Sequence, residues 1–180
     1  MQATRLTKLQ VNGAPATESP FVVKNTAGTT TLFEVQGNGV GAPIRYAQVA
    51  ISNAELAALR ATPKELVAAP GTGLVLEFVS IALFLDYTAP GFTETADNMA
   101  VRYTDGSGTI VSEAIECTGF IDQTADTMTT GRAKVDVIAA KAACENKALV
   151  LHNTGDGEWA NSGGSTMRAK VAYRVHQTGW

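Results

Sequence analysis

The most hydrophobic stretch of the chain runs Leu74-Val-Leu-Glu-Phe-Val-Ser-Ile-Ala-Leu-Phe-Leu-Asp-Tyr87, and the rest of the fold depends on it. Apolar residues occupy both alternating sets of positions, so a strand here would be apolar on both faces. Such a strand belongs in the interior of a sheet structure. With Glu77 and Asp86 inside it, the run is too short and too charged to span a bilayer, which requires about 20 apolar residues. The stretch therefore predicts a buried central strand.

The overall composition is that of a folded domain. The chain has 180 residues, of which 45% are hydrophobic and 17% charged, enough for one well-formed core. Its net charge of −3 offers no basic field for nucleic acid. The first residues contain no continuous apolar segment suited to a signal peptide, and neither end carries a lipidation signal. We therefore expect synthesis in a cytoplasm, with no nucleic-acid partner and no membrane partner.

Residues 1–45 differ in composition from the rest of the chain. They are rich in Thr, Gly, Asn and Ala and have no sustained apolar run, so they cannot form a core of their own. Within them, residues 21–24 and 31–35 are typical of two short strands joined by a turn. A lone hairpin is marginal in water. We predict that residues 1–45 are an extended β arm that pairs with another chain or lies on another surface.

Residues 46–180 have the composition of a core and form the predicted body. Its strand candidates are 46–52, 64–68, 74–87, 99–104, 109–117, 134–138, 148–152 and 167–175. Ser52 and Glu55 match a capping box and predict one short helix. The alanine-rich residues 139–144 fit either a turn or a single helical turn. Many strands at short intervals with one small helix indicate an all-β protein, an antiparallel β-sandwich or jelly roll.

No catalytic or metal-binding motif is visible in the sequence. His152 and His176 are the only histidines, and their spacing offers no third ligand for a metal. Cys117 and Cys144 are expected to be reduced, buried thiols, with a bridge between them as the alternative. A glycosidase needs two opposed carboxylates, a geometry that sequence alone does not show, and no serine lies in a nucleophile elbow. We predict a non-enzymatic protein without cofactor or metal.

Trp159 is unusual because it lies among Gly, Asn, Ser and acidic residues. Its ring could pack over a core edge, contact a neighbouring subunit or partner, or receive a ligand such as a sugar ring. The arm adds apolar residues on its two strands, which are suited to pairing with another chain. The predicted partner-binding residues are Phe21, Val23, Leu32, Phe33, Val35 and Trp159.

Two parts of the chain carry a resemblance to known proteins. The arm segment Phe21-Val-Val-Lys-Asn-Thr-Ala-Gly-Thr-Thr-Thr-Leu-Phe-Glu-Val-Gln-Gly-Asn-Gly-Val40 resembles repeating units of trimeric fibres in tailed bacteriophages. In the body, segments such as Val101-Arg-Tyr-Thr-Asp-Gly-Ser-Gly108 and Lys170-Val-Ala-Tyr-Arg-Val175 resemble a small domain of phage virion proteins. Together with further body segments, they cover most of the chain.

The resemblance implies a structural virion protein. It implies a trimeric, head fibre-like capsid decoration or cement protein, which would bind the major capsid protein on the outer surface of the phage head and stabilise it. The alternative that it implies is a tail fibre or receptor-binding tip, in which the Trp159 loop faces a host surface glycan. The expected partners are therefore two further copies of the chain and the major capsid protein, with a host glycan in the alternative.

Overall fold

The structure, a computed structural model, describes residues 21–24, 31–35, 44–94, 97–160 and 163–179. The chain divides into two compact units, Met1–Ala42 and Pro43–Trp180. In the first unit, β1 (Phe21–Lys24) and β2 (Thr31–Val35) pair antiparallel, with the strand bounds that the sequence predicts. They form a two-stranded sheet to which no other described strand is added.

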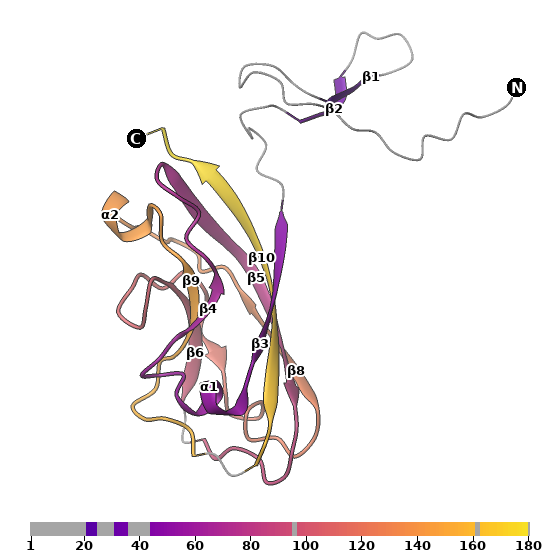
Figure 1. Ribbon diagram of the computed structural model, residues 1–180, viewed down its shortest axis with the longest axis vertical. Helices are drawn as coiled ribbons and strands as arrows, with labels where there is room; N and C mark the ends of the chain where they lie inside the picture. The colour runs from indigo at the N-terminus through magenta and orange to yellow at the C-terminus, as the bar shows by residue number, and fades with distance from the viewer. Residues whose placement is uncertain (1–20, 25–30, 36–43, 95–96, 161–162, 180) are drawn as a thin grey trace, which may run out of the picture. The chain divides into compact units, whose positions relative to one another are not determined.

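The second unit, the body, consists of two antiparallel sheets of four strands each (Figure 1). The first sheet has the order β3 (Arg45–Ile51), β10 (Thr166–Gln177), β5 (Leu74–Asp86), β8 (Thr127–Arg132). The second has the order β4 (Lys64–Val67), β9 (Leu149–Asn153), β6 (Asn98–Tyr103), β7 (Ile115–Glu116). The predicted all-β sandwich is confirmed.

The strand pairs are nested along the chain. β3 pairs with β10, β4 with β9, β5 with β8, and β6 with β7. A long hairpin that is rolled up in this way distributes its strands over two sheets, and two additional pairings, β10 with β5 and β9 with β6, complete them. Eight strands in two sheets with this nesting form a jelly roll.

The long strand β5 lies inside the first sheet, but only one of its faces is covered by the second sheet. Its interior residues are Leu76, Phe78, Ile81, Leu83 and Leu85, each at most 3% exposed. The opposite face is partly exposed, including the side chain of Phe84. The expectation of a strand buried on both faces is therefore wrong, because β5 lies in one layer of a two-layer sandwich, where each sheet covers only one face of the other.

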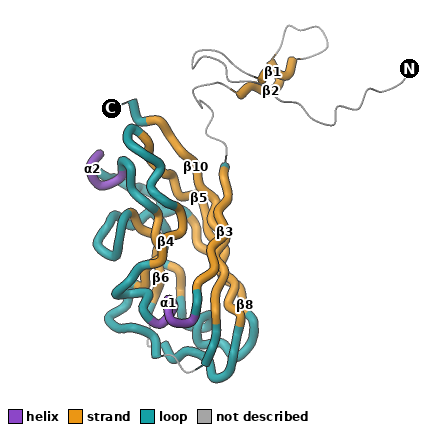
Figure 2. Tube along the Cα trace, in the orientation of Figure 1, coloured by secondary structure: helices purple, strands orange, loops and turns teal. Residues whose placement is uncertain are grey.

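Two short helices flank the sheets, at opposite ends of the body (Figure 2). α1 (Asn53–Ala57) begins with the predicted capping box, in which the Ser52 hydroxyl accepts the Glu55 N–H and the Glu55 carboxylate accepts the Ser52 N–H. α2 (Lys141–Cys144) is a single turn within the segment that fitted a turn or a helical turn. The prediction of one short helix is thus corrected to two.

Two strand predictions in the body fail. Only Ile115–Glu116 of the expected strand 109–117 belongs to a named strand, β7, although Ile110 and Ser112 form isolated bridges. The expected strand 134–138 lies in neither sheet, and Asp136 within it has a positive φ of 62°. The strand that pairs with β5 at this edge is β8, which no pattern in the sequence predicts.

Candidate partner-binding surface

The structure pairs four of the predicted arm residues across the hairpin. Phe21 lies opposite Val35, and Val23 lies opposite Phe33. The register shifts after Val23, so that Lys24 pairs with Thr31 and Leu32 has no directly opposite partner. The backbone of the hairpin therefore brings Phe21, Val23, Phe33 and Val35 together and leaves Leu32 outside the register.

Trp159 is a core residue, which corrects its prediction as a surface contact. Its side chain is 2% exposed and meets Phe92 edge to face, with ring centroids 6.3 Å apart. The polar segment around Trp159 thus places its one large apolar ring inside the body. Of the three readings of this residue, core packing is the one that the structure shows.

The other candidates for chemistry are dispersed over the body. His152 lies on β9 and His176 on β10, so they belong to different sheets. His152 lies beneath Gly106, and burial, followed by the nearby Arg102 charge, lowers its pKa. The carboxylate of Glu158 accepts the backbone N–H groups of Arg60 and Ala61. Within the described ranges, no three His, Cys, Asp or Glu residues are grouped closely enough to hold a metal ion.

Both cysteines are free and buried. Burial raises the pKa of Cys117, and the carboxylates of Glu94, Glu116 and Asp97 raise it further. A thiol held in its protonated form is a poor nucleophile. Cys117 therefore acts as a small apolar residue of the core, and Cys144 is likewise free and buried, as the sequence predicts.

A different surface gathers the residue types that bind partners: the outer face of the first sheet, which points away from the second sheet. The pairing register places the side chains of this face in rows across the four strands. Arg168 lies between Ala50 and Phe84, and Phe84 lies beside Met128. The next row contains Gln48, Lys170, Ala82 and Thr130. The row after it contains Tyr46, Ala172, Ser80 and Arg132.

The outer face exposes large apolar and cationic side chains beside small ones. Tyr46 is 78% exposed and Met128 is 56% exposed. The amine of Lys170 lies 5.4 Å from the centroid of the Phe84 ring, a cation–π contact. Small residues such as Ala82 lie between these side chains in the rows of paired residues.

Three cations of the outer face lack a carboxylate partner. Arg132, Arg168 and Lys170 form no ion pair with any residue that the structure describes. At the far end of the same face, Arg174 and His176 both contact the carboxylate of Glu77, at 3.1 Å and 2.6 Å. Burial acts to raise the pKa of Glu77, but the hydrogen bonds from His176 and Arg174 outweigh it, so the pKa lies below its ordinary value.

Arg168 lines three shallow depressions. One, of about 190 Å³, is lined by Gln48, Phe84, Arg168 and Lys170. Two others, of about 250 and 510 Å³, also contain Arg168 and reach Asp86. Arg168 and Lys170 thus line the hollow of about 190 Å³, which has no carboxylate in its lining and which a carboxylate of a partner can enter. The two larger hollows are already lined by carboxylates of this chain, Asp86 with Asp126 in one and Asp86 with Glu55 in the other.

The acidic counterpart lies at β7, an edge strand of the second sheet. Glu116 is exposed on this strand. Glu113 is exposed in the segment just before it, where its backbone N–H donates to the Arg132 carbonyl of β8. Neither carboxylate forms an ion pair within the described parts of the chain. Glu94 belongs to the same group, since its charge and that of Glu116 both act on Cys117. Because the whole chain carries a net charge of −3, the cationic outer face is an exception on an acidic molecule.

Sequence reasoning detects only part of this surface. The alternation of Arg168, Lys170 and Arg174 with apolar residues predicts a strand with one solvated face. Their neighbours Tyr46, Phe84 and Met128 come from three other strands, and only the register brings them together. No local signal marks these residues as one surface.

Comparisons with known proteins identify no relative. No protein-family model, no curated protein sequence and no solved structure matches the chain. Among the described residues, no helix is long and apolar enough to cross a membrane.

Proposed function

We propose that the chain is a non-enzymatic structural protein of a tailed-phage virion, a homotrimeric decoration or cement protein. In this role it binds the major capsid protein on the outer surface of the head and stabilises the head. The observation that carries the proposal is the sheet of β1 and β2, which consists of two described strands. Since two strands alone are marginal in water, such a sheet requires another chain or surface.

The topology of the body supports a virion role by analogy of fold. Jelly rolls recur in viral capsid proteins, where two packed sheets provide a rigid unit that presents loops and sheet faces to neighbours. Fold alone does not assign a function, and lectins use the same architecture. The N-terminal unit, Met1–Ala42, favours attachment to a larger assembly, because its described strands form a small sheet of their own.

The alternative role, a tail fibre or receptor-binding tip, depends on Trp159 as a platform for a host glycan. Its ring is 2% exposed and packs against Phe92, so it is not available to stack on a sugar. The tail-tip reading thereby loses the residue that favoured it. A glycan array with the full-length protein tests this alternative directly.

The experiment compares the full-length protein with a variant that lacks residues 1–42, which keeps all of β3. Phage heads stripped of the protein are incubated with each, and occupancy is counted by electron microscopy. We expect the truncated protein to stay folded and to lose at least about tenfold in occupancy, since backbone pairing supplies the attachment. Equal occupancy would show that the arm does not attach the protein, and binding to tails in place of heads would favour the alternative.

A further inference from the structure

The outer face of the first sheet has the composition of a protein interface. Interfaces are enriched in Tyr, Phe, Met and Arg relative to the rest of a protein surface. This face carries one Tyr, one Phe, one Met and three Arg side chains within the rows of four paired strands. They are Tyr46, Phe84, Met128, Arg132, Arg168 and Arg174.

The charge of the outer face specifies the chemistry of its partner. Arg132, Arg168 and Lys170 lack ion-pair partners among the described residues, and Arg168 and Lys170 border a hollow of about 190 Å³ whose lining contains no carboxylate. Cations in such positions are satisfied when carboxylates of a partner lie over them, since complementary charges fix the register of an interface and speed its formation. The partner is therefore acidic.

The same chain supplies an acidic surface of the required kind. Glu116 is exposed on the edge strand β7 and Glu113 just before it, and Glu94 lies close to Glu116, since both carboxylates act on Cys117. Neither Glu113 nor Glu116 has a cationic partner in the described residues. A contact between different surfaces of identical chains is heterologous, and it closes into a ring when the rotation between copies allows.

We propose that the outer face of the first sheet binds the acidic β7 edge of a second copy of this chain. Arg168 and Lys170 lie against Glu113 and Glu116 of the neighbouring copy, and Tyr46 and Met128 supply the apolar contact. This inference rests on the trimer of the proposed function and assigns the surfaces that build it. Three such contacts in succession close the ring.

The test uses full-length protein and charge reversal on each surface. One variant carries Arg168→Glu and Lys170→Glu, a second carries Glu113→Lys and Glu116→Lys, and a third carries all four substitutions. Multi-angle light scattering over a range of concentrations measures the oligomeric state. We expect a trimer for the wild type, a dissociation constant raised about a hundredfold or more in each reversed variant, and recovery of the trimer in the fourfold variant.

Two controls separate electrostatics from misfolding. Arg60→Glu with Lys147→Glu reverses two cations outside both surfaces and should leave the trimer intact. Far-ultraviolet circular dichroism spectra should be the same for all variants, whereas the melting temperatures of the dissociated variants should fall because subunit association stabilises the fold. Raising the salt from about 0.05 to 0.5 M should weaken the wild-type trimer, because exposed charges are screened.

Several outcomes would overturn the inference. If both reversed variants remain trimers, these surfaces do not form the contact, while the proposed capsid role still stands. If each reversal dissociates the trimer but the fourfold variant does not recover it, the outer face and the β7 edge do not touch each other. If the trimer persists and attachment to heads is lost, the outer face binds the capsid. A wild-type monomer would refute both the inference and the trimeric form of the proposed function.

Discussion

Tyr173 of β10 lies opposite Phe78 of β5, whereas the preceding residue, Ala172, lies opposite Ser80. Val79 is thus an extra residue in β5, a β-bulge. Because of the bulge, the residues of β5 that face the interior change from even-numbered to odd-numbered positions along the strand. Leu76 and Phe78 on one side of it, and Ile81, Leu83 and Leu85 on the other, point into the same interior, although their positions alternate differently.

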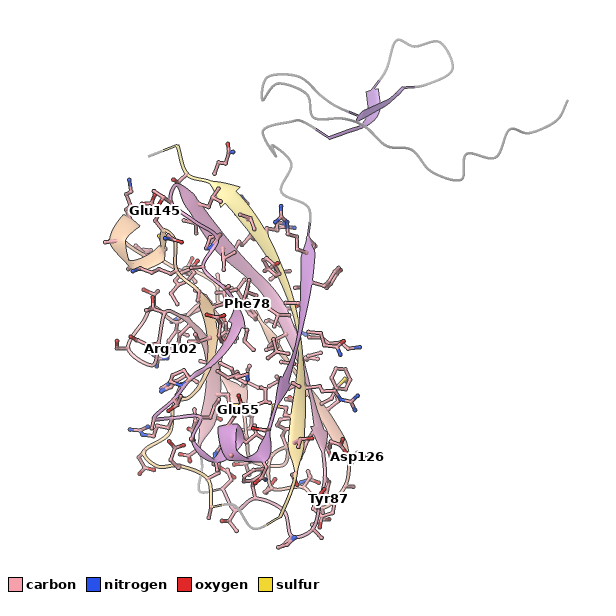
Figure 3. All side chains as sticks on the ribbon, viewed as in Figure 1. Glu55, Phe78, Tyr87, Arg102, Asp126 and Glu145 are labelled. Atoms are coloured by element: carbon pink, nitrogen blue, oxygen red, sulfur yellow. The ribbon has the colours of Figure 1, made fainter. Side chains whose placement is uncertain are left out.

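The bulge makes Phe78 a core residue, and Phe78→Asp should prevent soluble folding. The side chain is 3% exposed and lies between the two sheets (Figure 3). An unpaired buried carboxylate costs several kcal/mol, against a total stability of about 5–15 kcal/mol. The soluble yield and the melting curve measure the effect. Phe84→Asp makes the same change on the outer face and should leave the protein folded. A soluble Phe78→Asp variant with an unchanged melting curve would contradict the assigned register.

Trp159→Ala should destabilise the body by about 3–5 kcal/mol, the usual cost of truncating a large buried aromatic side chain. The ring fills space beside Phe92. Trp159→Phe should cost much less, because it keeps the ring contact and because the indole N–H has no acceptor among the described residues. Urea unfolding of the three proteins measures the difference. If Trp159→Ala unfolds at the wild-type urea concentration and only assembly is lost, then Trp159 contacts a partner.

The sequence suffices for those elements whose signals are local. The bounds of β1 and β2 follow from turn residues and short apolar runs, and α1 follows from the capping box at Ser52 and Glu55. The sandwich class follows from strand spacing. Each of these features depends on neighbours within a few residues, which is the range over which sequence patterns act.

The strand predictions fail where contacts between residues distant in sequence determine the structure. Residues 134–138 alternate like a strand, but the chain leaves the sheet there, with Asp136 in the left-handed region at φ 62°. β8 has an unremarkable Thr-rich sequence and is a strand because it pairs with the edge of β5. At Gly131 of β8, an added Cβ would lie 2.7 Å from the Ile115 side chain of β7, so the two sheets approach closely there and leave little room for a larger residue.

The candidate surface could not be found from the sequence for the same reason. Arg168 and Phe84 lie far apart in the chain and become neighbours only through the pairing of β10 with β5. For Trp159 the error is the opposite one, a buried residue predicted to contact a partner. The polar segment around it gives no sign that its one large ring points into the body. Propensity describes the segment, whereas tertiary packing decides the direction of the side chain.

Tyr103 should make the stability of the body sensitive to alkaline pH. Its hydroxyl is buried and donates to the Leu76 carbonyl, and burial, with Cys144 and Glu77 nearby, raises its pKa from 10.0 to about 12. The stability that the protonated Tyr103 hydroxyl contributes to the folded state is therefore fully present below pH 10 and is lost as the pH rises through 12. Unfolding free energies of wild type and Tyr103→Phe should converge across this interval. Tyr46→Phe, at a residue 78% exposed, serves as the control and should follow the wild type throughout.

Glu55 should contribute stability that disappears in acid. Its hydrogen bond with Lys64, followed by those with Ser52, lowers its pKa from 4.5 to about 2. Because the folded-state pKa is depressed, the contribution is present above pH 4.5 and is lost as the pH falls through 2. Glu55→Gln keeps a side chain that can close the capping box, so it removes mainly the ion pair with Lys64. At 43% side-chain exposure this pair is partly screened, and we expect a loss of about 0.5 kcal/mol at pH 7 that vanishes at pH 2.

Ser52→Ala distinguishes the cap from the charge. It removes the hydroxyl that accepts the Glu55 N–H and should cost about 1 kcal/mol. Since a hydroxyl does not titrate in this range, part of the loss should persist at pH 2, where the effect of Glu55→Gln has gone. Urea unfolding of both variants between pH 2 and 7 gives the two profiles. A Glu55→Gln effect that stays constant over this range would show that the carboxylate charge does not stabilise the start of α1.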